Sequence, residues 1–596
     1  MVRCTAYSTR VSALDERYDE IVAACKAENI THIGILASVT GKLLAEPARF
    51  REYRDRLAED GISCWAEVFA VGHPAMGRYY NEDGTPPEPP LHWEGDLIAE
   101  PGDDLGLLPT DWSYAVNEFG NPVYATAALD EAWERQNQRV VRELAAVFDE
   151  IWFDDEYRHD GDQGAGHPHT STAADYSDAV MAEVSAEAGR PVTREDVLAD
   201  QAVHDVWMTQ KTERFARMWQ SMCDTAREVN PNVQMGLMIR WFGEERDGLD
   251  VDQLVEAMQD PPLLRAGEGH FTAREYILPE SQVIEYLSAS YHVSWYPQAT
   301  EAWTETTYFE GVTHAWVLKK VALGLAAGCS AVSYCPCVPD WVIHQSYLEE
   351  DVDEIDMWAQ VMAYADRQVD PIVILRTPAA GRGDKQPTRR VRDRQAFPLF
   401  SMAGLFSTCI RQGGWRDDGS GSVLAVTGRS VWDVNLDTVQ GRHLVLDGAA
   451  LLEGAPLNEA LGISNVAKGA GGQVTFSCDA VKPAGMLYTS ADLTIIPYVW
   501  QDVAEAFMDT LLRDIRGVLG KIVRSVVLEG HPLAVPVHVR HADRDAVLLV
   551  NLMQEDRTVT LRLRGPRQRL LDEHGEPEPA HQVLRADEIK LLYAME

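Results

Sequence analysis

The chain has 596 residues, of which 45% are hydrophobic and 24% charged, so it exceeds a single ordinary core and predicts a globular protein of several domains. Its 53 Lys and Arg face 93 Asp and Glu, for a formal net charge of −40. This balance argues against nucleic acid or an anionic membrane as the partner, because both need positive surface.

The N-terminal segment 1–10 lacks the apolar run of a signal peptide, and no stretch is apolar for long enough to cross a membrane. We therefore expect a cytoplasmic protein. The nine cysteines are spread along the chain without the spacing of a disulfide framework. Cys335-Pro-Cys337 is a lone pair with no second pair to complete a metal site, so we expect no metal and no other cofactor.

Residues 1–367 alternate strand-like and helix-like segments. Predicted strands cover 4–8, 32–38, 64–71, 151–153, 233–239, 263–266, 291–296 and 330–334. Helical patterns lie between them, at 14–28, 47–60, 129–148, 204–229 and 312–327. Eight strand–helix units of this kind predict a (β/α)8 TIM barrel.

The pattern changes after residue 367. Residues 368–520 carry a strand at 371–375, a helical segment at 397–412 and, at 442–451, a buried strand meeting a helix; they predict a smaller α/β domain. From 521 to 596 alternating runs at 536–540, 546–551, 558–563 and 589–593 predict a small antiparallel β domain, with the strands of a sandwich.

The segment that carries chemistry follows the fourth predicted strand, where Asp154, Asp155 and Glu156 stand in a row. Like charges repel at the end of a buried strand, so the cluster costs stability and fits a place where a polar ligand is gripped or a proton delivered. A solvated acidic loop is the alternative, since the chain is rich in acids. In the functional reading Glu156 is a general acid/base whose proton affinity is raised by its two acidic neighbours.

A glycosidic bond is cleaved by two carboxyl groups on opposite sides of the anomeric carbon. Glu301, placed after the predicted seventh strand, is the candidate partner of Glu156 as nucleophile, with Glu305 and Glu268 as rivals. Arg240, after the fifth strand, is a candidate cation to keep that nucleophile ionised, or else an ordinary surface arginine.

Sugars present apolar faces as well as hydroxyls, so aromatic platforms are expected beside the two acids. The candidates at or just after predicted strands are Trp241, Trp295, Trp303 and Trp341, some of which can equally be core residues. His73, after the third strand, is a candidate to bind a hydroxyl. Asp154 and Asp155 complete the predicted substrate-binding set.

With these residues in place, the chain resembles clan-A glycoside hydrolases, and in its domain order the family 42 β-galactosidases. The local resemblance lies in the segments 117–122, 151–156 and 319–334, and in the turn 447–451 of the second domain. It implies a barrel, an amidotransferase-like trimerisation domain without amidotransferase activity, since no cysteine stands in that turn, and a small β domain. It also implies a retaining exo-glycosidase acting on a β-linked sugar, as a trimer.

Two features of the sequence depart from the family pattern. Asp155 stands where such enzymes carry an asparagine before the acid/base glutamate, and the four-cysteine zinc cluster of some members is missing. The family 164 β-mannosidases share the layout, so the sugar stays open. An inverting hydrolase and a non-catalytic carbohydrate-binding protein remain as alternative functions.

Overall fold

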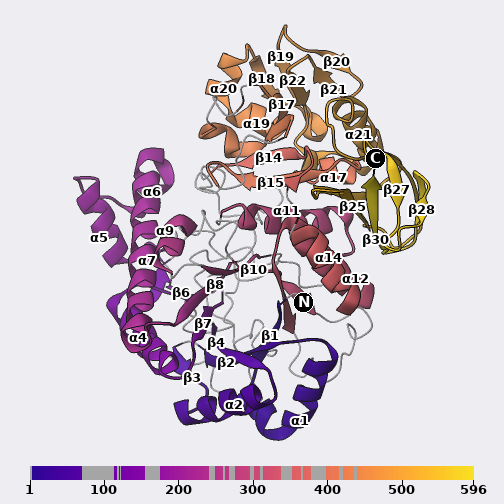
Figure 1. Ribbon diagram of the computed structural model, residues 1–596. Helices are drawn as coiled ribbons and strands as arrows, with labels where there is room; N and C mark the ends of the chain where they lie inside the picture. The colour runs from indigo at the N-terminus through magenta and orange to yellow at the C-terminus, as the bar shows by residue number, and fades with distance from the viewer. Residues whose placement is uncertain are drawn as a thin grey trace.

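In the computed structural model the chain forms three regions, each built around β-sheet (Figure 1). The residues that it describes are 3–39, 41–69, 113–116, 120, 122–154, 175–239, 249–258, 262–267, 276–295, 301–308, 313–336, 352–363, 365, 367–377, 397–414, 421–434, 439, 441–564 and 566–595.

Eight parallel strands close into a barrel, since β1 pairs with both β2 and β12. The barrel strands are β1 (Arg3–Thr9), β2 (His32–Val39), β4 (Ser63–Phe69), β7 (Glu150–Phe153), β8 (Gln234–Met238), β9 (Leu263–Arg265), β10 (Glu301–Trp303) and β12 (Ala331–Pro336). The predicted TIM barrel is thereby confirmed.

Helices form the outer ring of the barrel, seen from indigo to rose in Figure 1. They are α1 (Val11–Ala27), α2 (Pro47–Glu59), α4 (Glu131–Ala145), α7 (Gln201–Val229), α9 (Val251–Ala257), α11 (Pro279–Val293), α12 (His314–Ala327) and α14 (Val352–Ala363). Additional elements are β3 (Lys42–Leu43), β5 (Tyr114–Val116), β6 (Pro122–Ala127), α5 (Asp178–Glu187), α6 (Arg194–Ala199) and β11 (Thr306–Tyr308).

Three tryptophans fill the barrel interior and make it a packed core. Trp65, Trp152 and Trp303 are buried, and the rings of Trp152 and Trp303 stack with their centroids 3.7 Å apart. The neighbouring strands make room with glycines: a Cβ on Gly34 would lie 2.3 Å from the Trp65 ring, and one on Gly236 2.2 Å from the Trp152 ring. The tryptophan layer therefore depends on small residues on adjacent strands.

The seventh strand differs from the prediction. Of residues 291–296, predicted as a strand, 291–293 are the last residues of helix α11, 294–295 form a turn and 296 lies outside the described residues; the strand is β10, which begins at Glu301. Every residue of α11 from Ser281 to Val293 is buried, so no exposed face marks this helix, although the polar Ser281, Glu285, Ser288 and His292 recur at helical spacing. The β-branched and aromatic residues at the C-terminal end of α11 are of the types that favour strands, which explains the wrong prediction.

The second region is a mostly parallel sheet in the order β15-β14-β16-β17-β22-β21-β20. Its strands are β14 (Ile372–Arg376), β15 (Ser407–Arg411), β16 (Val423–Val426), β17 (His443–Asp447), β20 (Lys482–Ala484), β21 (Leu487–Thr489) and β22 (Leu493–Ile496). The small hairpin β18 (Ser464–Lys468) and β19 (Val474–Ser477) and the helices α17 (Leu399–Met402), α19 (Gly448–Glu453), α20 (Ala455–Ala460) and α21 (Glu505–Leu519) accompany it. The helix predicted over 397–412 is wrong: the segment is the single turn α17 followed by the strand β15, whose short sequence Ser-Thr-Cys-Ile-Arg mixes polar and apolar residues.

The C-terminal region is a sandwich of two antiparallel sheets with an apolar cluster between them. One sheet contains β13 (Arg367–Gln368), β24 (Ala534–Arg540), β25 (Asp545–Asn551), β30 (Ile589–Met595), β27 (Arg569–Leu571) and β28 (Pro577–Glu578), and the other contains β23 (Val527–Gly530), β26 (Arg557–Arg562) and β29 (His581–Leu584). Strand β13 pairs with β24, so the chain touches the last domain on its way from the barrel to the second.

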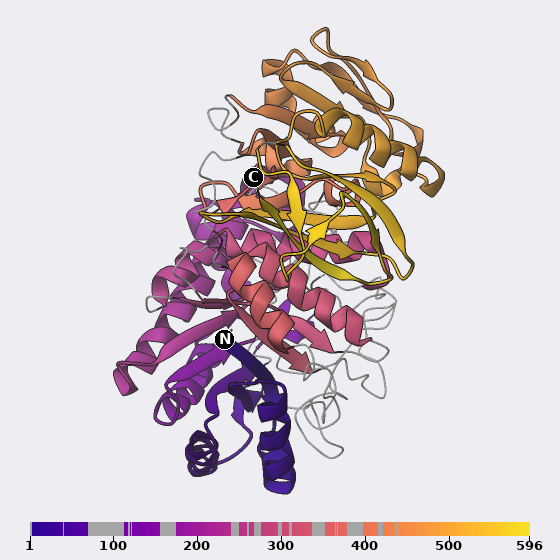
Figure 2. The ribbon, with the colours of Figure 1, turned by 45° about the vertical axis from the view of Figure 1, so that its right-hand side comes forward.

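The three regions pack together around α11 and α12 (Figures 1 and 2). Tyr286 of α11 donates to the carbonyl of Ser407 at the start of β15. Lys319 of α12 is fully buried and reaches Asp587 of the sandwich at 2.6 Å, while also donating to Gln282. Burial lowers the pKa of Lys319, and Asp587 opposes that effect. These contacts join the barrel to both other regions.

Candidate active site at the C-terminal end of the barrel

Strands β7 and β10 begin the same inward pattern: an acid at the first residue of the strand, a tryptophan two residues later and a second acid two residues after that. Alternate residues of a strand point to the same side, so Glu150, Trp152 and Asp154 share one face. On β10 and the residues that follow it, Glu301 and Glu305 flank the buried Trp303 in the same way. The tryptophan layer therefore separates two polar layers, one at each end of the barrel.

The polar layer at the C-terminal end is organised around Arg265, the last residue of β9. Its Nη1 lies 3.2 Å from Oδ1 of Asp154, and its Nη2 lies 3.2 Å from Oε1 of Glu305. The side chains of Arg265, Asp154 and Glu305 are 2%, 9% and 4% exposed. Arg265 Nη1 also lies 3.5 Å from the sulfur of Met238, which belongs to the apolar cluster that contains the three tryptophans.

Burying a carboxylate is costly unless a cation or hydrogen bonds compensate it. Here one guanidinium serves two buried carboxylates, and a third, Glu67 of β4, is fully buried two residues beyond the inward-pointing Trp65. The layer thus gathers acids at the C-terminal ends of parallel strands, the end at which barrels bind ligands.

The layer at the opposite end holds the residue that the sequence favoured as nucleophile. Glu301 is the first residue of β10 and pairs in register with Leu263, the first residue of β9. Arg3 binds it at 2.6 Å and binds Glu150 at 2.9 Å. Burial raises the pKa of Glu150, while Arg3 acts in the opposite direction. Glu301 therefore begins its strand, and the prediction that it follows a strand is corrected.

Two of the predicted aromatic platforms are placed elsewhere in the molecule. Trp303 is fully buried in the tryptophan layer. Trp295 follows α11, packs edge-on against Tyr291 and lies beneath Arg411 of the second domain, whose guanidinium is 5.0 Å from the ring centroid. Both tryptophans serve packing, which corrects their prediction as sugar platforms.

The other predicted site residues lie outside the residues that the structure describes. They are His73, Asp155, Glu156, Arg240, Trp241, Glu268 and Trp341. Of the predicted set, Asp154 and the rival glutamate Glu305 are brought together. Arg265, which joins them, was missed by the sequence argument. Its signal was a charged residue ending the apolar strand Leu263-Leu264-Arg265.

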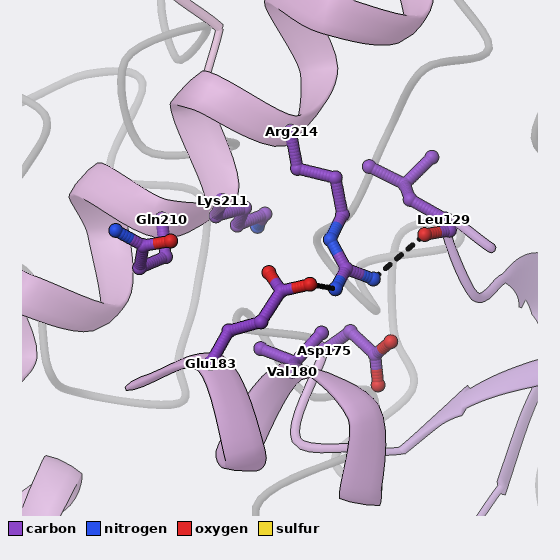
Figure 3. A pocket seen from close by; sticks show the side chains of 7 residues that line it. All are labelled: Leu129, Asp175, Val180, Glu183, Gln210, Lys211 and Arg214. Atoms are coloured by element: carbon purple, nitrogen blue, oxygen red, sulfur yellow. Dashed lines mark hydrogen bonds and ion pairs between the residues drawn. The ribbon is translucent and has the colours of Figure 1, made fainter. Parts of the chain in front are cut away.

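A separate cavity lies on the outer side of the barrel between α5 and α7 (Figure 3). Arg214 bridges Glu183 at 2.5 Å and the carbonyl of Leu129 at 2.7 Å. The cavity has room for about one water molecule and includes none of the carboxylates at the strand ends. It is not the candidate active site.

Within the described ranges, no three His, Cys, Asp or Glu side chains gather as a metal ion would require. In the same part of the chain, no helix combines the length and the apolar character needed to span a membrane.

The sequence matches no protein-family model and no curated protein sequence. Solved structures match over the whole chain. A β-galactosidase from Marinomonas has a TM-score of 0.62 at 10% identity, with 100% of both chains covered. A family 42 β-galactosidase of G. stearothermophilus has a TM-score of 0.61 at 10% identity, covering 100% of this chain and 98% of its own.

This chain has the fold of the family 42 β-galactosidases. A family 42 exo-carrageenase from Bacteroides ovatus also matches, with a TM-score of 0.52 at 11% identity, covering 100% of this chain and 80% of its own. The likeness spans the barrel, the second α/β region and the sandwich in one alignment. At these identities it establishes the fold, and the chemistry has to be argued from the residues.

Proposed function

We propose that the protein is a retaining exo-glycoside hydrolase acting on a β-linked sugar, β-galactosidase-like in substrate, with Glu305 as nucleophile and Glu156 as general acid/base. The observation that carries the proposal is the buried Asp154–Arg265–Glu305 cluster at the C-terminal end of the barrel. The shared fold of family 42 β-galactosidases supports it.

The two proposed carboxyl groups come from strands on different sides of the barrel axis. Glu305 follows β10, and Glu156 stands two residues beyond Asp154, which follows β7. In a retaining mechanism one carboxylate attacks the anomeric carbon while the other protonates the leaving oxygen, and water then hydrolyses the glycosyl ester. Glu305, paired with Arg265 at 3.2 Å, is held in the charged form that an attacking carboxylate needs.

The acid-rich layer also suits the charge that develops on the sugar. The transition state of glycoside cleavage has oxocarbenium character and so carries positive charge. Among the described residues, Asp154, Glu305 and the buried Glu67 bring three carboxyl groups to this layer, and Arg265 pairs with the first two. Preorganised negative charge near the anomeric carbon stabilises that transition state more than the neutral substrate.

The test is release of nitrophenol from a panel of α- and β-linked aryl glycosides by the wild type and by E156Q, E305Q and E301Q. We expect one β-glycoside to be turned over and its kcat/KM to fall about 1,000-fold or more in E156Q and E305Q. E301Q is the matched control, because Glu301 occupies the equivalent place on the same strand at the opposite end of the barrel. It should keep its activity and lose stability.

The outcomes separate the alternatives. Collapse in E301Q with full activity in E305Q would overturn the choice of nucleophile. If NMR shows that the sugar is first released as the inverted anomer, the retaining mechanism is wrong and an inverting one takes its place. Binding of a sugar without turnover of any glycoside would leave a carbohydrate-binding protein in place of the hydrolase.

The assembly and compartment complete the proposal. A trimer is what the resemblance of the second domain to a trimerisation domain implies, and light scattering should then give three times the chain mass of 66.4 kDa. A cytoplasmic location agrees with the seven described cysteines, none of which is in a disulfide, as in a reducing compartment. Labelling of thiols in cell extract prepared under acid quench should find them reduced.

A further inference from the structure

We propose that Asp154 and Arg265 form a positioning pair for Glu305, in which Asp154 orients Arg265, and Arg265 both aims the Glu305 carboxylate and sets how firmly it holds a proton. This inference rests on the proposed function, in which Glu305 is the nucleophile. Asp154 then acts through Arg265, and the earlier prediction of Asp154 as a sugar ligand is replaced.

The geometry of the guanidinium supports this division of roles. Nη1 faces Asp154 and Nη2 faces Glu305, each at 3.2 Å. Because the five N–H groups of arginine lie in one rigid plane, two separate carboxylates on different nitrogens fix the orientation of that plane. Asp154 comes from the end of β7 and Glu305 from the end of β10, so Arg265 on β9 ties together strands that are not neighbours of one another.

The tryptophan layer supports Arg265 on the side that faces the barrel interior. Arg265 Nη1 contacts the sulfur of Met238, and Met238 packs in the apolar cluster with Trp152 and Trp303. The guanidinium therefore has packed side chains beneath it, and it is 2% exposed. In such a low-dielectric setting the charges of Asp154 and Glu305 act on each other and on Arg265 far more strongly than they would in water.

The shared cation has a chemical consequence. If Arg265 served Glu305 alone, the carboxylate would be strongly stabilised and a weaker nucleophile. Asp154 takes part of the positive charge and adds a negative charge beside Glu305. The arrangement keeps Glu305 ionised without neutralising it, as attack on an anomeric carbon requires.

The measurement is the rate at which Glu305 is covalently labelled by a 2,4-dinitrophenyl 2-deoxy-2-fluoro-β-glycoside of the sugar found in the panel. A Glu305 oxygen forms a bond to the anomeric carbon, the bond to the aryl oxygen breaks, and dinitrophenolate leaves with the electron pair. The fluorine slows hydrolysis, so the ester accumulates and is located by peptide mass spectrometry. The labelling rate is measured from pH 4 to 9. The acid limb of this pH profile, where the rate falls toward low pH, reports protonation of the attacking group.

Opposite charge changes should move that acid limb in opposite directions. In R265M a cation is lost, so the limb moves to higher pH by about one pH unit, and labelling at pH 7 slows about 100-fold. In D154N a neighbouring anion is lost, so the limb moves to lower pH, and labelling slows because Arg265 is less well oriented. The double variant D154N/R265M should lie between the two single variants in its acid limb, since its charge changes cancel.

Arg3 provides a matched control at the other end of the barrel. It bridges Glu150 and Glu301 as Arg265 bridges Asp154 and Glu305, across the same two strands. R3M makes the same substitution in the same kind of cluster. It should lower the melting temperature and leave the labelling rate and the acid limb unchanged.

The outcomes distinguish this inference from the proposed function. If the wild type is not labelled at Glu305, the proposed nucleophile is wrong, whatever the variants do. If Glu305 is labelled and the acid limbs of R265M and D154N coincide with that of the wild type, the positioning pair is wrong. Should R265M fail to fold, D154N decides, because it is isosteric and an acid limb that stays in place or rises would overturn the inference.

Discussion

Asp447 offers a test of the second domain that depends only on burial and charge. It ends β17 and caps α19, and its Oδ1 accepts hydrogen bonds from the backbone nitrogens of Gly428 at 3.0 Å and Ala450 at 2.7 Å. Burial, partly offset by these bonds, raises the pKa of Asp447 from 3.8 to about 6. Above that pH the folded chain carries a buried charge that the unfolded chain would expose to water.

The sign follows from linkage between protonation and folding. Because the pKa is higher in the folded state, the stabilising contribution of the proton is complete below pH 3.8 and is lost as the pH rises through about 6. Each pH unit between these values is worth about 1.4 kcal/mol, so the loss is about 3 kcal/mol. D447N cannot ionise, and its side-chain oxygen can keep both backbone hydrogen bonds.

We therefore expect the stability of D447N relative to the wild type to be about 2.5 kcal/mol more favourable at pH 8 than at pH 4, since part of the loss has already occurred at pH 4. Comparing the two pH values removes pH-independent differences between an amide and a carboxylate. The assay is hydrogen exchange by mass spectrometry on the peptide 443–453 of the full chain, corrected for the intrinsic exchange rate at each pH. A difference that is the same at both pH values, or that reverses in sign, would refute the reasoning.

Other substitutions test the packing between and within domains. K319M removes the buried ammonium that binds Asp587, and it should destabilise the docking of the sandwich on the barrel by about 3–5 kcal/mol, seen as faster hydrogen exchange in β30. G236A places a Cβ 2.2 Å from the Trp152 ring and should cost about 1–3 kcal/mol, measured as a lower melting temperature; an unchanged value would contradict the close packing. G517A is its counterpart, since a Cβ there meets nothing within 4 Å on a helix, and it should stabilise by about 0.5–1 kcal/mol.

Much of the architecture could be read from local patterns. The strands at β1, β2, β4, β7, β8, β9 and β12 were predicted within a few residues, because β-branched and apolar runs bounded by turns and helices mark buried parallel strands. The second and third regions were recognised in the same way. The prediction failed at α11, which is buried from Ser281 to Val293 and ends in residues that favour strands, and at β15, a short strand of mixed polar and apolar residues after a helical turn.

The error at α11 had a direct effect on the site. With the seventh strand set at 291–296, Glu301 seemed to follow a strand, and Glu305 was only a rival. With the strand at Glu301–Trp303, the two glutamates lie on the same inward face at opposite ends. Arg265 was not chosen from the sequence, although it is a charged residue at the end of an apolar strand, because its partners Asp154 and Glu305 come from two other strands.

The sequence by itself determined that the chain is acidic, that a parallel barrel comes first and that acids follow the ends of its strands. Those features depend on composition and on spacing along the chain, both of which are visible in the sequence. Only the tertiary structure decided which acids meet. Asp154, Arg265 and Glu305 come from three strands, and their contact depends on the register with which β7, β9 and β10 close around the tryptophan layer. A shift by one residue would turn each of these side chains outward, so the site is a property of register, which local sequence does not encode.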